Sequence, residues 1–198
     1  EGDSSFSVGD LYLGRVKKVM PGLNAAFVDI GYEKDAFLHY LDLGSQYLSL
    51  AKYLKSAMTN NRSKSLLDNF DFASDIDKNG KINKVLSANQ NILVQVVKEP
   101  ISTKGPRISC ELSLAGRYLV LIPFSDKISI SQKISSAEER ARLKRLILSI
   151  KPKNFGIIIR TVAEYKKVAE LDADLRDLVS RWKSCYAKLK TVKPPNRV

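Results

Sequence analysis

Two short segments, residues 25–31 and 35–40, alternate between two sets of side chains, and this pattern constrains the fold more than any other sequence feature. Because successive side chains of a β-strand point to opposite faces, each segment is predicted to be a strand with one core face. The residues expected on the core face are Ala26, Val28, Ile30, Ala36, Leu38 and Tyr40. Phe27 and Phe37 fall on the opposite faces, beside polar residues. The two strands are therefore expected to present aromatic rings outside the core.

Other strand-like segments indicate a β-rich amino-terminal lobe that ends near residue 112. Strands are predicted over residues 8–20, 91–98, 107–114 and 118–124. The sequence Pro21-Gly22-Leu23-Asn24 predicts a turn. Residues 46–69 are polar without clear periodicity, so a long insertion is expected between two strands, at about residues 46–80. Short strands with one long connection and outward aromatic rings are typical of an OB-type barrel.

The rest of the chain, residues 113–198, is expected to form a mixed α/β lobe. Ser136 and Glu139 have the spacing of a helix capping box, and apolar residues at helical spacing predict a second helix over about residues 168–190. Between these helices, residues 155–159 are wholly apolar, which is typical of a strand buried on both faces of a sheet.

The net charge of +12 is concentrated in the last third of the sequence. Residues 1–126 carry 15 basic and 14 acidic side chains, whereas residues 127–198 carry 18 basic and 7 acidic ones, a net charge of +11. A basic surface of this kind favours polyanions such as nucleic acid or acidic lipid. The same charge is also compatible with a solvated helix face.

Several functional classes are disfavoured by composition. The two cysteines, Cys110 and Cys185, fit neither a disulfide framework nor a zinc knuckle, and are expected to be reduced thiols of a cytoplasmic protein. A lone histidine, His39, argues against an imidazole-based metal or catalytic site. No apolar run approaches the roughly 18 residues that a membrane helix needs. The chain begins with Glu1 rather than Met and carries no signal peptide, so we expect a piece of a longer protein.

The outward phenylalanines are the first candidate binding site. Bases of single-stranded nucleic acid stack on exposed aromatic rings of OB-type barrels, so Phe27 and Phe37 are the predicted platforms. His39 lies beside them in the strand pattern, and Lys104, in the Thr103-Lys104-Gly105 loop, is a candidate phosphate contact. The alternative is that one or both phenylalanines close the end of the barrel core.

Arg160 and Thr161 form the second candidate site, because an apolar strand ends at them abruptly. Ligands collect where the strands of an α/β sheet end, and arginine binds phosphate through paired donors. The alternative is an arginine held in a salt bridge at a strand terminus.

Two acidic patterns are judged not to be metal sites. Residues 75–82 resemble the start of a calcium-binding EF-hand loop, but the twelfth position is Leu86 instead of a bidentate glutamate. Acidic residues near the end of the chain are expected on the solvent side of a helix; they are Asp172, Asp174 and Asp177. A two-metal nuclease needs converging carboxylates, and no such set can be chosen, so no catalytic or metal-binding residue is predicted.

Several separated motifs stand out: Gly9-Asp10-Leu11-Tyr12-Leu13-Gly14-Arg15-Val16, residues 21–31, Ala36-Phe37-Leu38, residues 113–121 and Ile159-Arg160-Thr161. Together they resemble the ribonuclease E/G family, which contains the RNA-binding domain named after ribosomal protein S1. The resemblance is closest to the ribonuclease G branch. The motifs cover nearly the whole chain except the insertion. The resemblance implies a magnesium-dependent endoribonuclease that cuts single-stranded RNA and prefers a 5′-monophosphate end.

The resemblance also implies roles for individual residues. Phe27 and Phe37 would stack on bases, and Lys104 would contact RNA. Arg160 and Thr161 would bind the terminal phosphate, with the backbone around Val120 completing that pocket. In one departure from the family, Gln132-Lys133 follow Ile130-Ser131 where paired arginines are common, which implies a pocket with less supporting charge.

The expected architecture is α+β: a five-stranded OB-type (S1-like) barrel over residues 1–112, packed on a partial RNase H-like and 5′-sensor α/β lobe over residues 113–198. Family resemblance places the catalytic aspartates and the zinc-linking cysteines beyond Val198, and further strands before Glu1. We therefore expect this chain to bind single-stranded, 5′-monophosphorylated RNA without cutting it and without a cofactor of its own. Magnesium, cleavage and homo-oligomer formation are expected of the full-length protein.

Two other functional classes remain open. One is a non-enzymatic S1-type RNA-binding module, associated with the ribosome or with transcription. The other is a scaffold whose basic carboxy-terminal third docks an acidic protein or a membrane.

Overall fold

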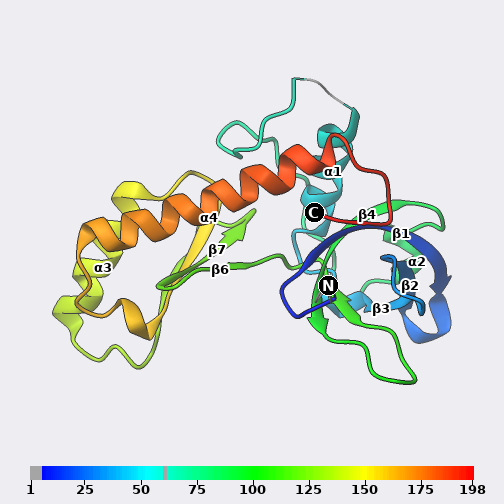
Figure 1. Cartoon of the computed structure of the whole chain (residues 1–198), viewed down its shortest axis with the longest axis horizontal. Helices are drawn as coiled ribbons and strands as arrows, with labels where there is room; N and C mark the ends of the chain where they lie inside the picture. Colours follow the sequence, from blue (N-terminus) through cyan, green and yellow to red (C-terminus); the bar gives the residue numbers. More distant parts are fainter. Residues whose placement is uncertain (1–5, 60–61) are drawn as a thin grey trace, which may run out of the picture. The chain divides into compact units, whose positions relative to one another are not determined.

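The computed structural model describes residues 6–59 and 62–198, and two sheets organise them (Figure 1). The chain divides into two compact units. The first comprises Glu1–Ser63, Phe72–Leu112 and Tyr186–Val198; the second comprises Lys64–Asp71 and Ser113–Cys185. Relative to a division after residue 112, residues 64–71 and 186–198 lie in the other unit. No helix within the described ranges is both long enough and apolar enough to cross a lipid bilayer.

A closed barrel of mixed strands forms the first unit. Its strands are β1 (Leu11–Met20), β2 (Ala25–Asp29), β3 (Ala36–His39), β4 (Asn91–Lys98) and β5 (Arg107–Ser109). They follow the order β1-β2-β3-β5-β4, and β4 pairs back with β1 to close the barrel. The β3–β5 pair is parallel, whereas the other barrel pairs are antiparallel. A short strand, β10 (Asn196–Arg197), adds to β1. The expected OB-type barrel is confirmed.

The predicted alternation of β2 and β3 is confirmed by burial. The side chains of the expected core face, Ala26, Val28, Ala36 and Leu38, are each 0% exposed. Phe27 and Phe37 are half-buried and directly opposite each other in the β2–β3 register. Apolar side chains on one face therefore fill the barrel, and the phenylalanines stand on the other.

The predicted turn between β1 and β2 holds the segment that resembles a calcium loop. Pro21–Leu23 form a 3-10 helix, and Asn24 follows with a left-handed backbone at φ 49°. The side chain of Asn24 donates to the Gly80 carbonyl (3.1 Å) and accepts from the Ile82 amide (2.7 Å). Tyr40, at the end of β3, donates its hydroxyl proton to the Asp77 carbonyl. The main chain of this segment is thus fastened to the barrel.

The long insertion predicted between two strands is present, and it is partly helical. Helix α1 (Tyr47–Thr59) and the short helix α2 (Ile82–Val85) lie between β3 and β4. The buried side chains of α1 follow helical spacing; they are Tyr47, Ser49, Leu50, Tyr53, Leu54 and Ala57. Ser49 is 0% exposed, and its buried hydroxyl is satisfied because it accepts a hydrogen bond from the Ala73 amide (3.0 Å). Tyrosines and a serine thus supply part of the buried face of α1, so its helical periodicity is not visible as a repeat of purely apolar residues. Residues 60 and 61 lie outside the described ranges.

A small sheet and two helices form the second unit. The sheet order is β6 (Leu114–Ala115), β7 (Leu119–Pro123), β9 (Phe155–Ile159) and β8 (Ile128–Ile130), and the helices are α3 (Ala137–Ile150) and α4 (Val168–Leu189). Trp182 of α4 is buried against Phe155 and Phe124, with ring centroids 5.9 and 6.4 Å away. Ile158 is 37% exposed, so the expectation that residues 155–159 are buried on both faces fails at this position.

The amino-terminal cap of α3 is present, but the carboxylate of its glutamate binds residues other than the capping serine. The Ser136 hydroxyl accepts from the Glu139 amide (3.2 Å), as predicted. The Glu139 carboxylate, almost fully buried, accepts from the Arg142 guanidinium (2.9 Å) and from the Tyr165 amide. The hydrogen bond from Arg142 holds the pKa of Glu139 below its ordinary value. Arg142 also donates to the Lys166 carbonyl (2.9 Å), so α3 fixes the loop before α4.

Asp174 of α4 organises the turn that leads into β7. Its carboxylate accepts from the amides of Arg117 (3.0 Å), Tyr118 (2.9 Å) and Leu119 (2.9 Å). A Cβ atom at Gly116 would lie 2.7 Å from an Asp174 carboxylate oxygen, so glycine permits the close approach. The expectation that Asp174 lies on the solvent face of a helix was wrong, because its carboxylate binds the amides of this turn. These amides are distant in sequence, so no local pattern indicates the contact.

Replacing Asp174 with alanine should lower the free energy of unfolding by roughly 2–4 kcal/mol, because three backbone amides, two of them in part-buried hydrogen bonds, lose a charged acceptor. Urea denaturation followed by circular dichroism measures this change. Asp177→Ala, at an exposed position of the same helix, is the matched control and should change stability little. Equal stability of the two variants would show that the contacts of Asp174 do not hold the turn.

Candidate nucleic-acid interface

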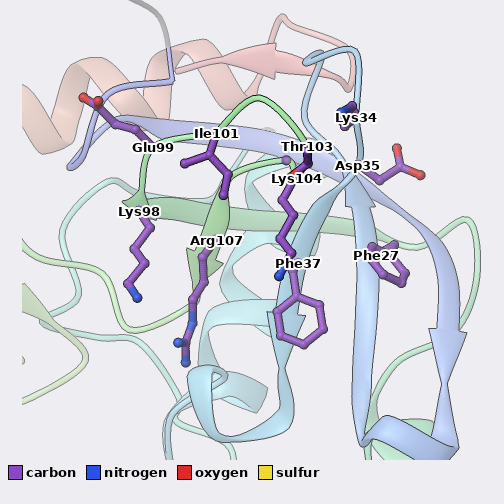
Figure 2. Close-up of a pocket in the computed structure, with 11 residues that line it drawn as sticks. Phe27, Lys34, Asp35, Phe37, Lys98, Glu99, Ile101, Thr103, Lys104 and Arg107 are labelled. Atoms are coloured by element: carbon purple, nitrogen blue, oxygen red, sulfur yellow. The ribbon is translucent and has the colours of Figure 1, made fainter.

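The barrel carries an open groove of about 830 Å³ whose floor includes Phe27 and Phe37. One wall is the loop that joins β4 to β5; Figure 2 shows Lys104 of this loop reaching toward Phe37, with Lys98 and Arg107 beside it. The groove thus combines aromatic surface with cationic side chains. Three of the four residues predicted to contact RNA, namely Phe27, Phe37 and Lys104, line it together.

The two phenylalanine rings lie edge to face, with centroids 5.9 Å apart and an interplanar angle of 63°. Both side chains are half-buried, whereas their neighbours in sequence, such as Ala26 and Ala36, are fully buried in the barrel. The rings therefore line the groove instead of closing the core. This arrangement leaves aromatic surface available for a flat ligand.

A row of cations extends the aromatic pair across the barrel strands. In the strand register Lys18 is opposite Phe27, and Phe37 is opposite Arg107, which is in turn opposite Lys98. Because directly opposite residues of paired strands point to the same face, the row places cations on both sides of the rings. These three cations are exposed. None of these three cations was predicted to contact RNA. Lys18 could have been found by extending the strand alternation back along β1 from the predicted turn at residues 21–24.

Arg107 is held in place by Asp42. The Nε of Arg107 donates to one carboxylate oxygen of Asp42 (3.2 Å), and one terminal nitrogen donates to the other (3.2 Å). This fork-to-fork geometry fixes the plane of the guanidinium beside Phe37. The donors on its other terminal nitrogen face away from this pair and are available to a ligand.

Neighbouring main chain fixes the loop that carries Lys104. Ile101 and Lys104 form an isolated antiparallel bridge, and the Lys34 ammonium donates to the Ser102 carbonyl (2.9 Å). At Gly105 the backbones pack so closely that a Cβ atom would lie 2.3 Å from the Asp35 carbonyl oxygen. The groove wall is therefore set by glycine and by hydrogen bonds.

His39 occupies a different position from the other predicted RNA contacts. It ends β3, where its Nδ1 accepts from the Leu41 amide (3.1 Å) and caps a 3-10 helix. This hydrogen bond uses one ring nitrogen for local structure. His39 is not among the groove-lining residues, which come from β2 to β5 and from the β2–β3 and β4–β5 connections.

Arg160 and Thr161 lie together at the end of β9, in the second unit. One terminal nitrogen of Arg160 donates to the carbonyls of Gly116 (2.7 Å) and Arg117 (3.1 Å). The guanidinium is thus bound to main-chain carbonyls rather than to a carboxylate. Arg160 and Thr161 are both exposed. The guanidinium presents further donors to solvent.

A serine joins this second site. The hydroxyls of Thr161 and Ser131 lie 2.6 Å apart. Arg140 fixes the serine, because its guanidinium donates to the carbonyls of Ser131 (2.8 Å) and Ile134 (3.0 Å). The sequence analysis noted Ser131 only for the residues that follow it. The parallel pairing of β8 with β9, which brings the two hydroxyls together, was not predicted.

The remaining residues named for this site lie close by in the sheet or the chain. Val120 lies in β7 opposite Ile158, two residues before Arg160, and its side chain is half-buried. Gln132 and Lys133 are exposed in the turn after β8. The backbone amide of Lys133 donates to the Ser131 hydroxyl (3.3 Å), so this residue contacts the hydroxyl pair through its main chain.

Neither cysteine belongs to either site. Cys110 and Cys185 are free thiols and both are buried. Burial raises the pKa of the Cys110 thiol well above its ordinary value, so the group stays protonated and unreactive. In residues 6–59 and 62–198, no three histidine, cysteine, aspartate or glutamate side chains gather as metal ligands would.

Comparisons with known proteins find similarity to ribonucleases E and G. Residues 113–198 match the sequence model of the ribonuclease E/G family. Ribonuclease E of Nostoc sp. is 36% identical over 189 residues, which is 95% of this chain and 24% of that protein. Ribonuclease G of Haemophilus influenzae is 39% identical over 176 residues, or 89% of this chain and 32% of that protein. Ribonuclease G of Escherichia coli (strain K12) is 37% identical over 175 residues, or 88% and 32%.

The chain therefore spans about a quarter to a third of the length of these relatives. Relatives named ribonuclease E and relatives named ribonuclease G match it at similar identity. These matches confirm the predicted resemblance: residues 113–198 match the ribonuclease E/G family model, and most of the chain is similar to part of ribonucleases E and G.

Proposed function

We propose that this chain binds single-stranded RNA in the barrel groove and recognises a 5′-monophosphate at Arg160 and Thr161. The observation that carries the proposal is the row of side chains in which Phe27 and Phe37 lie between cations. Bases stack on the rings, and the flanking cations contact the phosphates on either side. The similarity to ribonucleases E and G supports RNA as the polyanion.

Unpaired RNA fits this surface better than a duplex does. In a duplex the bases are stacked on one another, so their faces are not available to a protein ring. The groove offers ring surface from Phe27 and Phe37, together with Lys104 on its wall. Stacking on such rings depends little on base identity, so we expect weak sequence preference at this site.

The phosphate proposal rests on donors that are already in place. The contacts of Arg160 with the 116–117 carbonyls orient its guanidinium before any ligand arrives. One hydroxyl of the Thr161–Ser131 pair donates to the other, so the pair offers one further donor, and the backbone around Val120 lies in the neighbouring strand. A terminal monophosphate carries more negative charge than an internal phosphodiester, so this cationic group favours the RNA end. Lys133 takes part of the role that paired arginines would have.

We propose further that the complete protein is a magnesium-dependent endoribonuclease of RNA processing and decay. Homo-oligomer formation and a cytoplasmic location belong to that proposal. Within it, these 198 residues bind and orient RNA and leave the chemistry to other parts of the protein. Incubated with magnesium and single-stranded RNA, the chain should leave the RNA intact. A magnesium-dependent cleavage product would contradict this division of roles.

Replacing either Phe27 or Phe37 with alanine should weaken the binding of a short single-stranded RNA by about tenfold or more, because each loses a stacking platform. Fluorescence anisotropy with labelled oligouridine measures the affinity. Leu23→Ala removes an exposed apolar side chain of the same barrel, outside the groove, and is the matched control. Unchanged affinity in both phenylalanine variants would contradict the barrel proposal and favour a basic scaffold for an acidic partner.

Replacing Arg160 with alanine should remove a preference of the chain for 5′-monophosphorylated RNA, because a charged donor pair is lost. The same oligonucleotide is compared with a monophosphate, a triphosphate and a hydroxyl end. We expect the monophosphate form to bind the unaltered chain several-fold more tightly. Thr161→Val, which removes only a hydroxyl, should reduce the preference in part.

Arg145→Ala, at an exposed position of α3, controls for the loss of one positive charge and should preserve the preference. If the unaltered chain binds all three ends equally, it has no end sensor and is a plain RNA-binding module of the ribosome or of transcription.

A further inference from the structure

Tyr165 is an exposed aromatic residue in a backbone conformation that aromatic residues rarely adopt. Its φ is 60°, in the left-handed region, and its side chain is 69% exposed. The left-handed region is unfavourable for a bulky side chain, and such outliers are concentrated at functional sites. A tyrosine that only filled space would be expected to be buried. The unfavourable backbone conformation and the exposed ring together indicate that the ring serves a purpose other than packing.

The surrounding structure holds Tyr165 in this conformation. Its amide donates to the buried carboxylate of Glu139, and the next carbonyl, that of Lys166, accepts from Arg142. Glu139 and Arg142 are themselves paired through hydrogen bonds of 2.5 and 2.9 Å. Both main-chain groups around the ring are thus tied to α3. The ring is consequently presented from a fixed support.

Tyr165 is also close in the chain to the proposed phosphate site. The intervening residues form a tight turn, in which the Ala163 amide donates to the Arg160 carbonyl (2.9 Å) and the Glu164 amide to the Thr161 carbonyl (3.0 Å). Tyr165 lies four positions after Thr161, and even a fully extended chain spans only about 14 Å over four positions. The ring therefore lies within a nucleotide or two of a phosphate held at Thr161.

The neighbourhood of the ring is both apolar and basic. Val162 and Val168 are 51% and 56% exposed on either side of it in the sequence. Lys166 and Lys167 follow it directly. An aromatic ring with an apolar rim and adjacent cations suits a ligand that is flat, apolar on its faces and anionic at one end. A 5′-terminal nucleotide has these properties.

We propose that Tyr165 stacks on the base of the 5′-terminal nucleotide whose monophosphate is bound at Arg160 and Thr161. This inference rests on the proposed 5′-phosphate site and adds a second contact to it. The site then recognises the first nucleotide as a unit, by its phosphate and by its base. Because stacking tolerates every base, the contact rewards the presence of a base and not a particular sequence.

The test compares two 5′-monophosphorylated RNAs that differ only at the first nucleotide, which carries either its normal base or an abasic sugar. We expect the unaltered chain to bind the abasic RNA roughly five- to fiftyfold more weakly. Tyr165→Asn removes the ring but tolerates a positive φ, so folding is preserved. This variant should bind the two RNAs equally, and Tyr165→Phe should restore the difference.

The outcomes separate this inference from the proposal beneath it. If Arg160→Ala abolishes the preference for a monophosphate while the unaltered chain binds abasic and normal ends equally, the phosphate site stands and the role of Tyr165 is overturned. If the monophosphate preference is absent in the unaltered chain, the proposed function fails first. A difference between normal and abasic ends that persists in Tyr165→Asn also overturns the inference, because another residue must then contact the base.

Discussion

The parallel pairing of β3 with β5 is the constraint on which the barrel site depends. It closes the sheet between Phe37 and Arg107, with the Phe37 amide donating to the Pro106 carbonyl (2.9 Å). Without it, Arg107 would not lie beside the ring, and the β4–β5 loop would not form a wall of the groove. Gly105 permits the closure because no other residue fits against the Asp35 carbonyl. One long-range strand pair therefore sets both the fold of this unit and the spacing of its ligand contacts.

The second unit achieves a similar result with charged side chains in place of strand pairing. Around the turn before β7, Asp174 takes up the amides, while Arg160 and Arg181 take up the carbonyls of residues 115–117. Arg160 is thus both a support of the turn and the proposed phosphate ligand. We expect stacking to contribute most on the barrel and phosphate contacts to contribute most at Arg160 and Thr161, so binding at the second site should be the more sensitive to salt.

Sequence reasoning succeeded where the pattern was local and failed where it depended on contacts between distant residues. Strand alternation was enough to place Phe27 and Phe37 outside the core, and capping chemistry was enough to start α3 at Ser136. The roles of Asp174 and Ser131 depend on segments more than twenty residues away, so no local pattern reveals them. The bounds of helix α1 could not be predicted because tyrosines and Ser49 supply part of its buried face. The left-handed conformation of Tyr165 likewise has no sequence signal.

Ultraviolet crosslinking of a 5′-monophosphorylated, thiouridine-substituted RNA to the chain, with the attached peptides identified by mass spectrometry, tests the central claim most directly. The account predicts crosslinks to residues 25–40 and 98–107, which form the barrel groove. It also predicts that the 5′-terminal nucleotide alone crosslinks near residues 160–167. Crosslinks confined to the basic faces of α3 and α4, with none on the barrel strands, would contradict it.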